Sequence, residues 1–168
     1  MSDASVEFRS ESTLIGSERA QLESFLYDNR LTLVTALEGL SDEQARRRLV
    51  PSLTCPAAIV KHCAFVERVW FPVAIEGLSR QELGLPADAE DSWLLVNGDT
   101  SASILADYRS AWTESEHIAS RHGLDDIAVH NRRGPLTLRW IMLHMIEELA
   151  RHAGHADILR EQILAEVY

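Results

Sequence analysis

The chain has 168 residues, a length typical of one folded domain, and 46% hydrophobic with 25% charged residues is ordinary for a soluble globular protein. Its formal net charge of −10 argues against nucleic acid or an anionic membrane as a partner, because both attract positively charged surfaces. No apolar run approaches the ~20 residues that a membrane span needs. The acidic N-terminus has no signal-peptide pattern, and Cys55 and Cys63 lack the spacing of a zinc or redox motif, so we predict a cytoplasmic protein.

The first part of the chain predicts a leader and two helices. Residues 1–15, rich in Ser and Glu, are expected to form a flexible leader, and residues 16–168 to form a single domain. Leucines at helical spacing predict a first helix from Ser17 to Leu40. Ser41 and Gln44 have the spacing of a capping box, which predicts that a short helix begins there.

The middle of the chain predicts two further long helices. One begins near Pro56 and ends near Glu76, and Pro72 is expected to kink or end it. Residues 77–100 form a connection with a short helical turn near Ser79–Leu83. The next helix is predicted over Ser101–His122, because Asp99 and Thr100 suit a helix start.

The last part of the chain predicts a fourth long helix. A connection through Asn131–Pro135 leads into a helix over Thr137–Ala165. No segment is expected to be a strand, since the apolar stretch Asp126–Val129 is too short. Four amphipathic helices with three connections predict an all-α, up-down four-helix bundle.

Two polar residues interrupt the apolar stripe of the last helix. Glu148 and His152 lie in line with Met145 and Leu159, and their spacing of four places both on one helix face. A carboxylate inside a protein core needs a partner, because burying it alone costs many kcal/mol. A metal ion is one such partner.

The helix that begins near Pro56 carries a matching anomaly. His62 lies between Ile59 and Val66 on an apolar face. Imidazole and carboxylate groups are ligands for zinc first, and also for nickel, iron or manganese. Two histidines and one carboxylate from two helices leave coordination positions open, as in a catalytic rather than a structural metal site.

Other interpretations of these residues stay open at this point. A single histidine on an apolar face is commonly a hydrogen-bonded core residue, and Glu148 and His152 could pair directly or lie at a dimer surface. His144 and His155 lie in a flanking row of the same helix, so either could replace a ligand or support one from behind.

The remaining candidates are interpreted more simply. Arg68 and Arg151 are candidates for binding an anionic substrate near the metal, and Cys63 is expected to be a small core residue. Three histidines in polar surroundings are expected at the surface, namely His117, His122 and His130. The tryptophans are expected to anchor the core or its rim, and these are Trp70, Trp93, Trp112 and Trp140.

Three stretches of the chain resemble a known family. They centre on Ile59-Val60-Lys61-His62, on Gly98-Asp99-Thr100-Ser101 and, most specifically, on Ala150-Arg151-His152-Ala153-Gly154-His155. Together, from about residue 17 onward, they are similar to the mini-circle, or DUF664, branch of the DinB-like superfamily. That superfamily includes four-helix metalloproteins, thiol-dependent S-transferases and the mycothiol-dependent maleylpyruvate isomerase.

The resemblance implies a ligand set and a reaction class. Isomerase-like members have one histidine on the second long helix and Glu-x-x-x-His on the fourth, which His62, Glu148 and His152 match. It implies a divalent metal, a small-molecule thiol such as mycothiol, an electrophile and a homodimer. His144 and His155 are then candidates for proton transfer. There are two alternatives. One is a protein that binds a metal or small ligand in stress responses without turnover, and the other is a bundle with a metal-free Glu–His pair.

Two features depart from the family pattern. The isomerases have an additional C-terminal domain, whereas this chain stops soon after the fourth long helix, so isomerase activity itself is not expected. Leu53 and Cys55 stand where this branch often has Gly and Ser. That change concerns the start of a helix and leaves the implied ligands untouched.

Overall fold

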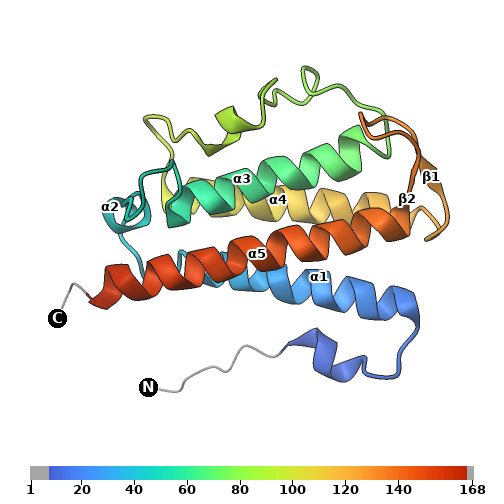
Figure 1. Ribbon diagram of the computed structural model, residues 1–168, viewed down its shortest axis with the longest axis horizontal. Coiled ribbons are helices and arrows are strands. Elements are labelled where there is room, and N and C mark those ends of the chain that lie inside the picture. Colours follow the sequence, from blue (N-terminus) through green and yellow to red (C-terminus); the bar gives the residue numbers. More distant parts are fainter. Residues whose placement is uncertain (1–7, 166–168) are drawn as a thin grey trace.

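The computed structural model describes residues 8–165, and this part of the chain is mostly helical (Figure 1). Its α-helices are α1 (Glu18–Thr35), α2 (Asp42–Ala45), α3 (Pro56–Arg68), α4 (Ser101–Ser120) and α5 (Leu138–Ala165). The prediction of an all-α protein is confirmed. One detail was missed, because β1 (Ile127–Ala128) pairs antiparallel with β2 (Leu136–Thr137) just before α5.

Side-chain caps define where the predicted helices begin. The Ser17 hydroxyl accepts a hydrogen bond from the Ala20 N–H at the start of α1. Ser41 and Gln44 form both hydrogen bonds of a capping box at α2, as the spacing predicts. Thr100 caps α4, which satisfies backbone N–H groups that the first turn of a helix leaves without partners. The first long helix is shorter than predicted, because the chain turns after Thr35 rather than at Leu40.

The helices α3 and α4 run in the same direction. Their polar contacts follow both helices in the same order. Lys61, in the middle of α3, pairs at 2.8 Å with Asp99 just before α4, and Arg68, at the end of α3, pairs at 2.6 Å with Asp107 within α4. The prediction of a strictly alternating up-down order is therefore wrong at this step. The reason is the connection over residues 77–100, which is long enough to return along α3 before α4 begins (Figure 1).

The other long helices, α1 and α5, form a second parallel pair. Arg139 pairs with Glu18 at the beginnings of these helices, and Arg160 donates to the Ala36 carbonyl at their ends. Arg19, at the start of α1, donates to the Ala119 carbonyl at the end of α4. The two parallel pairs thus run in opposite directions, which places α3 against α5 across the centre of the molecule (Figure 1).

Pro72 changes the end of α3 as predicted. The regular α-helix ends at Arg68, and a π-helical turn follows over Val69–Val73. Within this wider turn the Ala74 N–H donates to the Val69 carbonyl, five residues back. Because proline has no N–H to give, the wider turn carries the chain past Pro72 without an α-helical hydrogen bond at that position.

The described part of the predicted leader is folded against α1. Residues 9–12 form a 3₁₀ turn, and the backbone N–H groups of Arg9 and Ser10 donate to the buried carboxylate of Asp28 at 2.8 and 3.0 Å. Residues 9–12 of the expected leader therefore lie against α1. The first seven residues of that leader lie outside the described part of the chain.

The core lies between the two pairs of helices. Its largest fully buried side chains include Leu33 on α1, Ile59 on α3, Tyr108 on α4 and Met145 on α5. A periodicity of three to four residues places these apolar side chains on the inner faces, and their burial stabilises the packing. Among residues 8–165, no helix combines the length and the apolarity that crossing a bilayer requires.

Candidate metal centre

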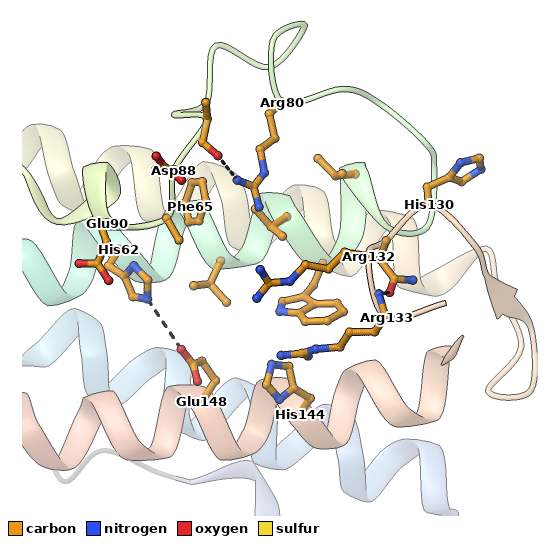
Figure 2. Close-up of a pocket in the computed structure, with 17 residues that line it drawn as sticks. His62, Phe65, Arg80, Asp88, Glu90, His130, Arg132, Arg133, His144 and Glu148 are labelled. Carbon is orange, nitrogen blue, oxygen red and sulfur yellow. Dashed lines mark hydrogen bonds and ion pairs between the residues drawn. The ribbon is translucent and has the colours of Figure 1, made fainter. Parts of the chain in front are cut away.

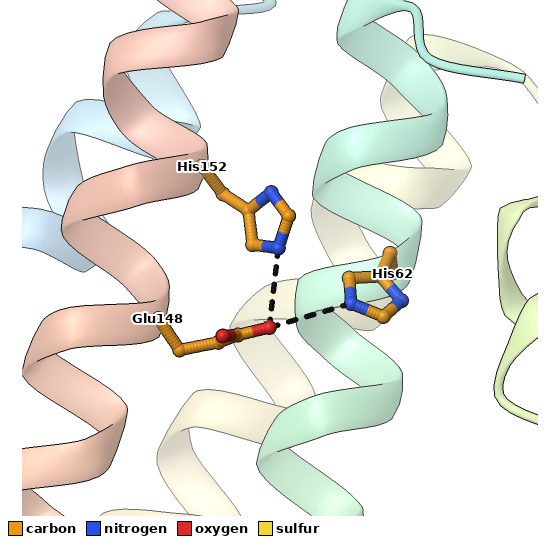
Figure 3. A group of neighbouring side chains, drawn as sticks. All are labelled: His62, Glu148 and His152. Carbon is orange, nitrogen blue, oxygen red and sulfur yellow. Dashed lines mark hydrogen bonds and ion pairs between the residues drawn. The ribbon is translucent and has the colours of Figure 1, made fainter. Parts of the chain in front are cut away.

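His62, Glu148 and His152 come together where α3 faces α5 (Figure 3). One potential ligand atom from each side chain lies within 4.8 Å of the other two. The Glu148 Oε1 atom is 3.2 Å from the Nε2 atom of His152 and 3.7 Å from the Nε2 atom of His62. The structure therefore assembles in one place the three side chains that interrupt the apolar stripes of the sequence.

Burial and charge distinguish this cluster from a surface group of polar residues. Both histidines are buried, and Glu148 is half-buried. The hydrogen bond with His152, and then the neighbouring ring of His62, hold the pKa of Glu148 well below its usual range, although desolvation acts in the opposite direction. A negative carboxylate is thus stabilised at a point where the chain supplies imidazole groups as its nearest polar neighbours.

His62 is held in one orientation by Ser92. The Nδ1 atom of His62 lies 2.7 Å from the Ser92 hydroxyl, and that hydroxyl donates its only hydrogen to the Ala89 carbonyl. The hydroxyl must therefore accept from His62, which places a proton on Nδ1. The ring also stacks on Trp93, with centroids 4.1 Å apart and an interplanar angle of 17°.

This orientation creates a need for positive charge beside Glu148. In the neutral imidazole the Nε2 lone pair of His62 faces a carboxylate oxygen, and two lone pairs do not attract each other. Either a second proton on the His62 ring or a metal ion between the two groups removes this conflict. A metal-free ion pair and a metal centre are therefore two states that fit this geometry.

His152 is oriented by packing rather than by a second hydrogen bond. Its Nε2 atom faces Glu148, and its ring meets those of His62 and Trp93 with centroids 5.1 and 5.3 Å away. The Nδ1 atom of His152 is buried and has no hydrogen-bond partner among the described residues. The α5 side of the cluster is thus less constrained than the α3 side.

The structure separates the two flanking histidines of α5. His144 is half-buried one turn before Glu148, where its ring stacks on Trp140 and meets the edge of Trp70. Burial, and then the positive charge of Arg133, lower the pKa of His144. His155 is exposed, and its ring centroid lies 5.8 Å from that of His152. His144 thus faces the same space as Glu148, and His155 does not.

A cleft of about 650 Å³ opens beside the cluster, between α3, α5 and the connections around residues 80–90 and 130–133 (Figure 2). His62 and Glu148 lie at one end of it and His144 lies further along. Its apolar wall comes from α3 and the π-helical turn, and consists of Phe65, Val66, Val69, Trp70 and Val73. The cleft therefore offers a small organic molecule both apolar contact and access to the cluster.

The two arginines predicted to bind substrate pair with carboxylates, and Arg151 also lies 3.9 Å from Glu148. Arg68 pairs with Asp107 on α4, and Arg151 pairs with Glu147 on α5. Neither lines the cleft, which instead receives Arg80, Arg132 and Arg133. Sequence reasoning missed these three because they belong to connections, where no helical periodicity indicates a direction. The one local signal was the sequence Arg132-Arg133-Gly134-Pro135, in which Gly and Pro indicate a turn and the two arginines give it two positive charges.

The other candidates take the positions expected of them, with small differences. Cys63 is fully buried, and burial raises the pKa of its thiol well above the usual value, so it is a core residue. His117 and His130 are exposed, whereas His122 is half-buried beside Glu76. Trp93 covers His62 from a 3₁₀ turn over Glu90–Trp93, which the sequence analysis did not predict.

Fold and site together define a mostly helical protein with a candidate metal centre beside a cleft. The family model of the mycothiol S-transferases matches residues 21–165, which include all three clustered side chains. The chain therefore belongs to the mycothiol S-transferase family, a DinB-like family. No curated protein matches the chain.

Proposed function

We propose that this protein is a metal-dependent S-transferase that uses mycothiol or a similar small thiol, built on a DinB-like four-helix bundle. The observation that carries the proposal is the convergence of His62, Glu148 and His152 at the end of an accessible cleft. A buried cluster of this composition could have a purely structural role, but its opening to a cleft favours a site that admits a substrate.

The three side chains suit a divalent metal ion. His62 can present an unprotonated Nε2 atom because its Nδ1 proton is committed to Ser92, and such a partner behind a ligand is common at metal sites. Glu148 is ionised and supplies the negative charge that a dication needs. Zinc is the first candidate, with nickel, iron or manganese as alternatives. A cytoplasmic location and a homodimer belong to the same proposal.

The reaction joins the thiol to an electrophile. A new bond forms between the thiol sulfur and the electrophilic carbon, the leaving group departs with its electron pair, and the thiol proton is released. When bound, the metal ion lowers the pKa of a coordinated thiol, so that the nucleophilic thiolate is present at neutral pH.

The residues of the chain have separate roles in this scheme. His62, Glu148 and His152 hold the metal ion at the end of the cleft, and the apolar wall there limits the access of water. His144 is placed to accept the thiol proton, because it lines the same cleft and its lowered pKa keeps the ring neutral near pH 7. His155 is not among the residues that line the cleft, so we assign the proton transfer to His144.

The test combines metal analysis with a transfer assay. Protein purified without an affinity tag is analysed for bound metals and then assayed with mycothiol and 1-chloro-2,4-dinitrobenzene. We expect about one equivalent of divalent metal, and we expect His152→Ala to lose the metal and to slow transfer by about 100-fold or more. The matched control is His155→Ala, which removes an exposed imidazole three residues away and should retain both.

Two results would contradict the proposal in different ways. The first result is that the wild-type protein contains no metal, or that His152→Ala has the same metal content and transfer rate as the wild type. Either outcome would mean that Glu148 and His152 form a structural ion pair. Stoichiometric metal without transfer, tested over several thiols and electrophiles, would instead indicate a binding protein.

A further inference from the structure

Three arginines line the cleft beside the metal cluster, Arg80 over Phe65 and Arg132 and Arg133 from the loop before α5. The side chains of Arg80, Arg132 and Arg133 point into the cleft in Figure 2. Within residues 8–165, none of them lies within 4.0 Å of a carboxylate. Asp88 and Glu90 also line the cleft; Glu90 lies beside His62, and Asp88 lies beside Phe65 on the side of Arg80 (Figure 2). In a chain with a net charge of −10, this group of unpaired guanidinium ions is unusual.

The loop that carries two of these arginines is held by its own hydrogen bonds. The Asn131 side chain accepts from the Arg133 N–H at 2.9 Å and donates to the Gly134 carbonyl at 2.9 Å. Gly134 has a φ of +89°, which a residue with a side chain rarely adopts, so the turn requires glycine here. The direction of the loop toward the cleft is therefore built into its backbone.

Two of the guanidinium groups are also held in position by aromatic rings and a carbonyl group. Arg133 lies over Trp70 and Trp140, 5.1 and 5.5 Å from their ring centroids. Arg80 donates to the Ala87 carbonyl and lies 5.2 Å from the centroid of Phe65. Because these contacts already restrict the arginine side chains, the binding of an anion costs less side-chain conformational entropy than it would with freely moving arginines.

We infer that Arg80, Arg132 and Arg133 form an anion-binding subsite that selects a small molecule carrying a carboxylate. Guanidinium groups bind carboxylates through paired charge-assisted hydrogen bonds, and the subsite is linked to the metal cluster by the apolar wall of the cleft. The matching molecule has an anionic group at one end and an apolar body. In the reaction, this molecule is the electrophile, an assignment that rests on the proposed function.

The binding test needs no turnover and no metal. Metal-free protein is titrated with 4-chloro-3-nitrobenzoate and with 4-chloro-3-nitrobenzamide, and binding is followed by quenching of tryptophan fluorescence, since Trp70 and Trp140 flank Arg133. We expect the benzoate to bind about 10-fold more tightly than the amide, and Arg132→Gln to weaken benzoate binding about 10-fold while the amide is unaffected. Metal-free protein is used so that the carboxylate cannot bind a metal ion instead.

The choice of variants keeps the test independent of folding. No hydrogen bond or ion pair involves the Arg132 side chain within the described residues, so its replacement should leave the fold intact. Arg133→Gln provides a second variant, although it also removes the contacts with the tryptophans. The matched control is Arg109→Gln, which removes an exposed arginine of α4 outside the cleft and should change nothing.

A kinetic measurement assigns the subsite to one co-substrate. With the loaded protein, the thiol displaces chloride from either arene, which forms a C–S bond, breaks the C–Cl bond and releases chloride and a proton. We expect Arg132→Gln to raise the KM for the benzoate about 10-fold and to leave the KM for the thiol unchanged. A rise in the KM for the thiol alone would overturn the assignment to the electrophile.

The outcomes separate this inference from the proposed function. Equal affinity for the benzoate and the amide, or benzoate binding that Arg132→Gln leaves unchanged, overturns the subsite even if transfer with neutral electrophiles is rapid. Arginine-dependent benzoate binding without any thiol transfer supports the subsite and contradicts the proposed reaction.

Discussion

The Nδ1 atom of His62 lies 2.7 Å from the hydroxyl of Ser92, a residue 30 positions further along the chain. Ser92 is itself tied to the Ala89 carbonyl, and its neighbour Trp93 stacks on the same imidazole ring. The connection between α3 and α4 therefore fixes which nitrogen of His62 faces Glu148. A loop, rather than a helix, sets the chemistry available at one side of the cluster.

Replacing Ser92 by alanine should weaken metal binding without unfolding the protein. His62 then loses the partner that keeps its proton on Nδ1, and loss of such a partner typically costs about 10- to 100-fold in metal affinity. Competition with a chromogenic chelator measures the affinity for zinc. Ser120→Ala, an exposed hydroxyl of α4, serves as the control. Equal zinc affinity in all three proteins would show that Ser92 does not support the site.

The buried pair of Arg30 and Glu67 should be a major determinant of stability. Two hydrogen bonds of 2.7 and 2.8 Å join them, and the residues are only 2% and 0% exposed. Arg30→Met leaves Glu67 charged and buried without its partner, which should lower the free energy of unfolding by about 3–5 kcal/mol. Urea denaturation followed by circular dichroism measures the change.

The matched control for this pair is the ion pair between half-buried Arg68 and exposed Asp107. Arg68→Met should cost less than about 1 kcal/mol in the same experiment, because water screens the pair. A double variant, Arg30→Met with Glu67→Leu, should recover much of the lost stability, since it removes both buried charges. A similar loss in all three variants would indicate that packing, rather than charge, stabilises this position.

His144 should titrate below the usual pKa of histidine, because burial and then Arg133 disfavour its charged form. As the pH falls, a histidine whose pKa is lowered by folding is protonated in the unfolded chain before it is protonated in the folded protein. Its neutral form therefore stabilises the fold fully above the unfolded pKa of about 6.5, and this contribution is lost as the pH falls toward the folded pKa. NMR titration of the imidazole protons measures the value.

The variant Arg133→Gln should raise the pKa of His144 toward its usual value, while Arg109→Gln should leave it unchanged. The titration is best done on metal-free protein, so that ligand exchange at Glu148 does not contribute. An imidazole that titrates at the same pH in wild type and in Arg133→Gln would mean that the guanidinium group does not act on His144.

The sequence predicted those features that depend on neighbours within one helical turn. Ser41 with Gln44 identified a capping box, and Thr100 identified the start of α4, because caps are local hydrogen bonds. The positions of Glu148 and His152 followed from the periodicity of a single helix. The pairing with His62 needed only the expectation that apolar faces meet in the core, so all three clustered residues were found in advance.

Only the tertiary structure decided the direction of the helices and the shape of the cleft. The path of residues 77–100 makes α3 parallel to α4, and it brings Ser92 and Trp93 onto His62. Likewise, the loop that carries Arg132 and Arg133 approaches the π-helical turn after α3, where Arg133 lies over Trp70, a residue far away in the sequence. Helical periodicity reports which face of a segment is buried, whereas the route of a connection depends on long-range packing that no local pattern encodes.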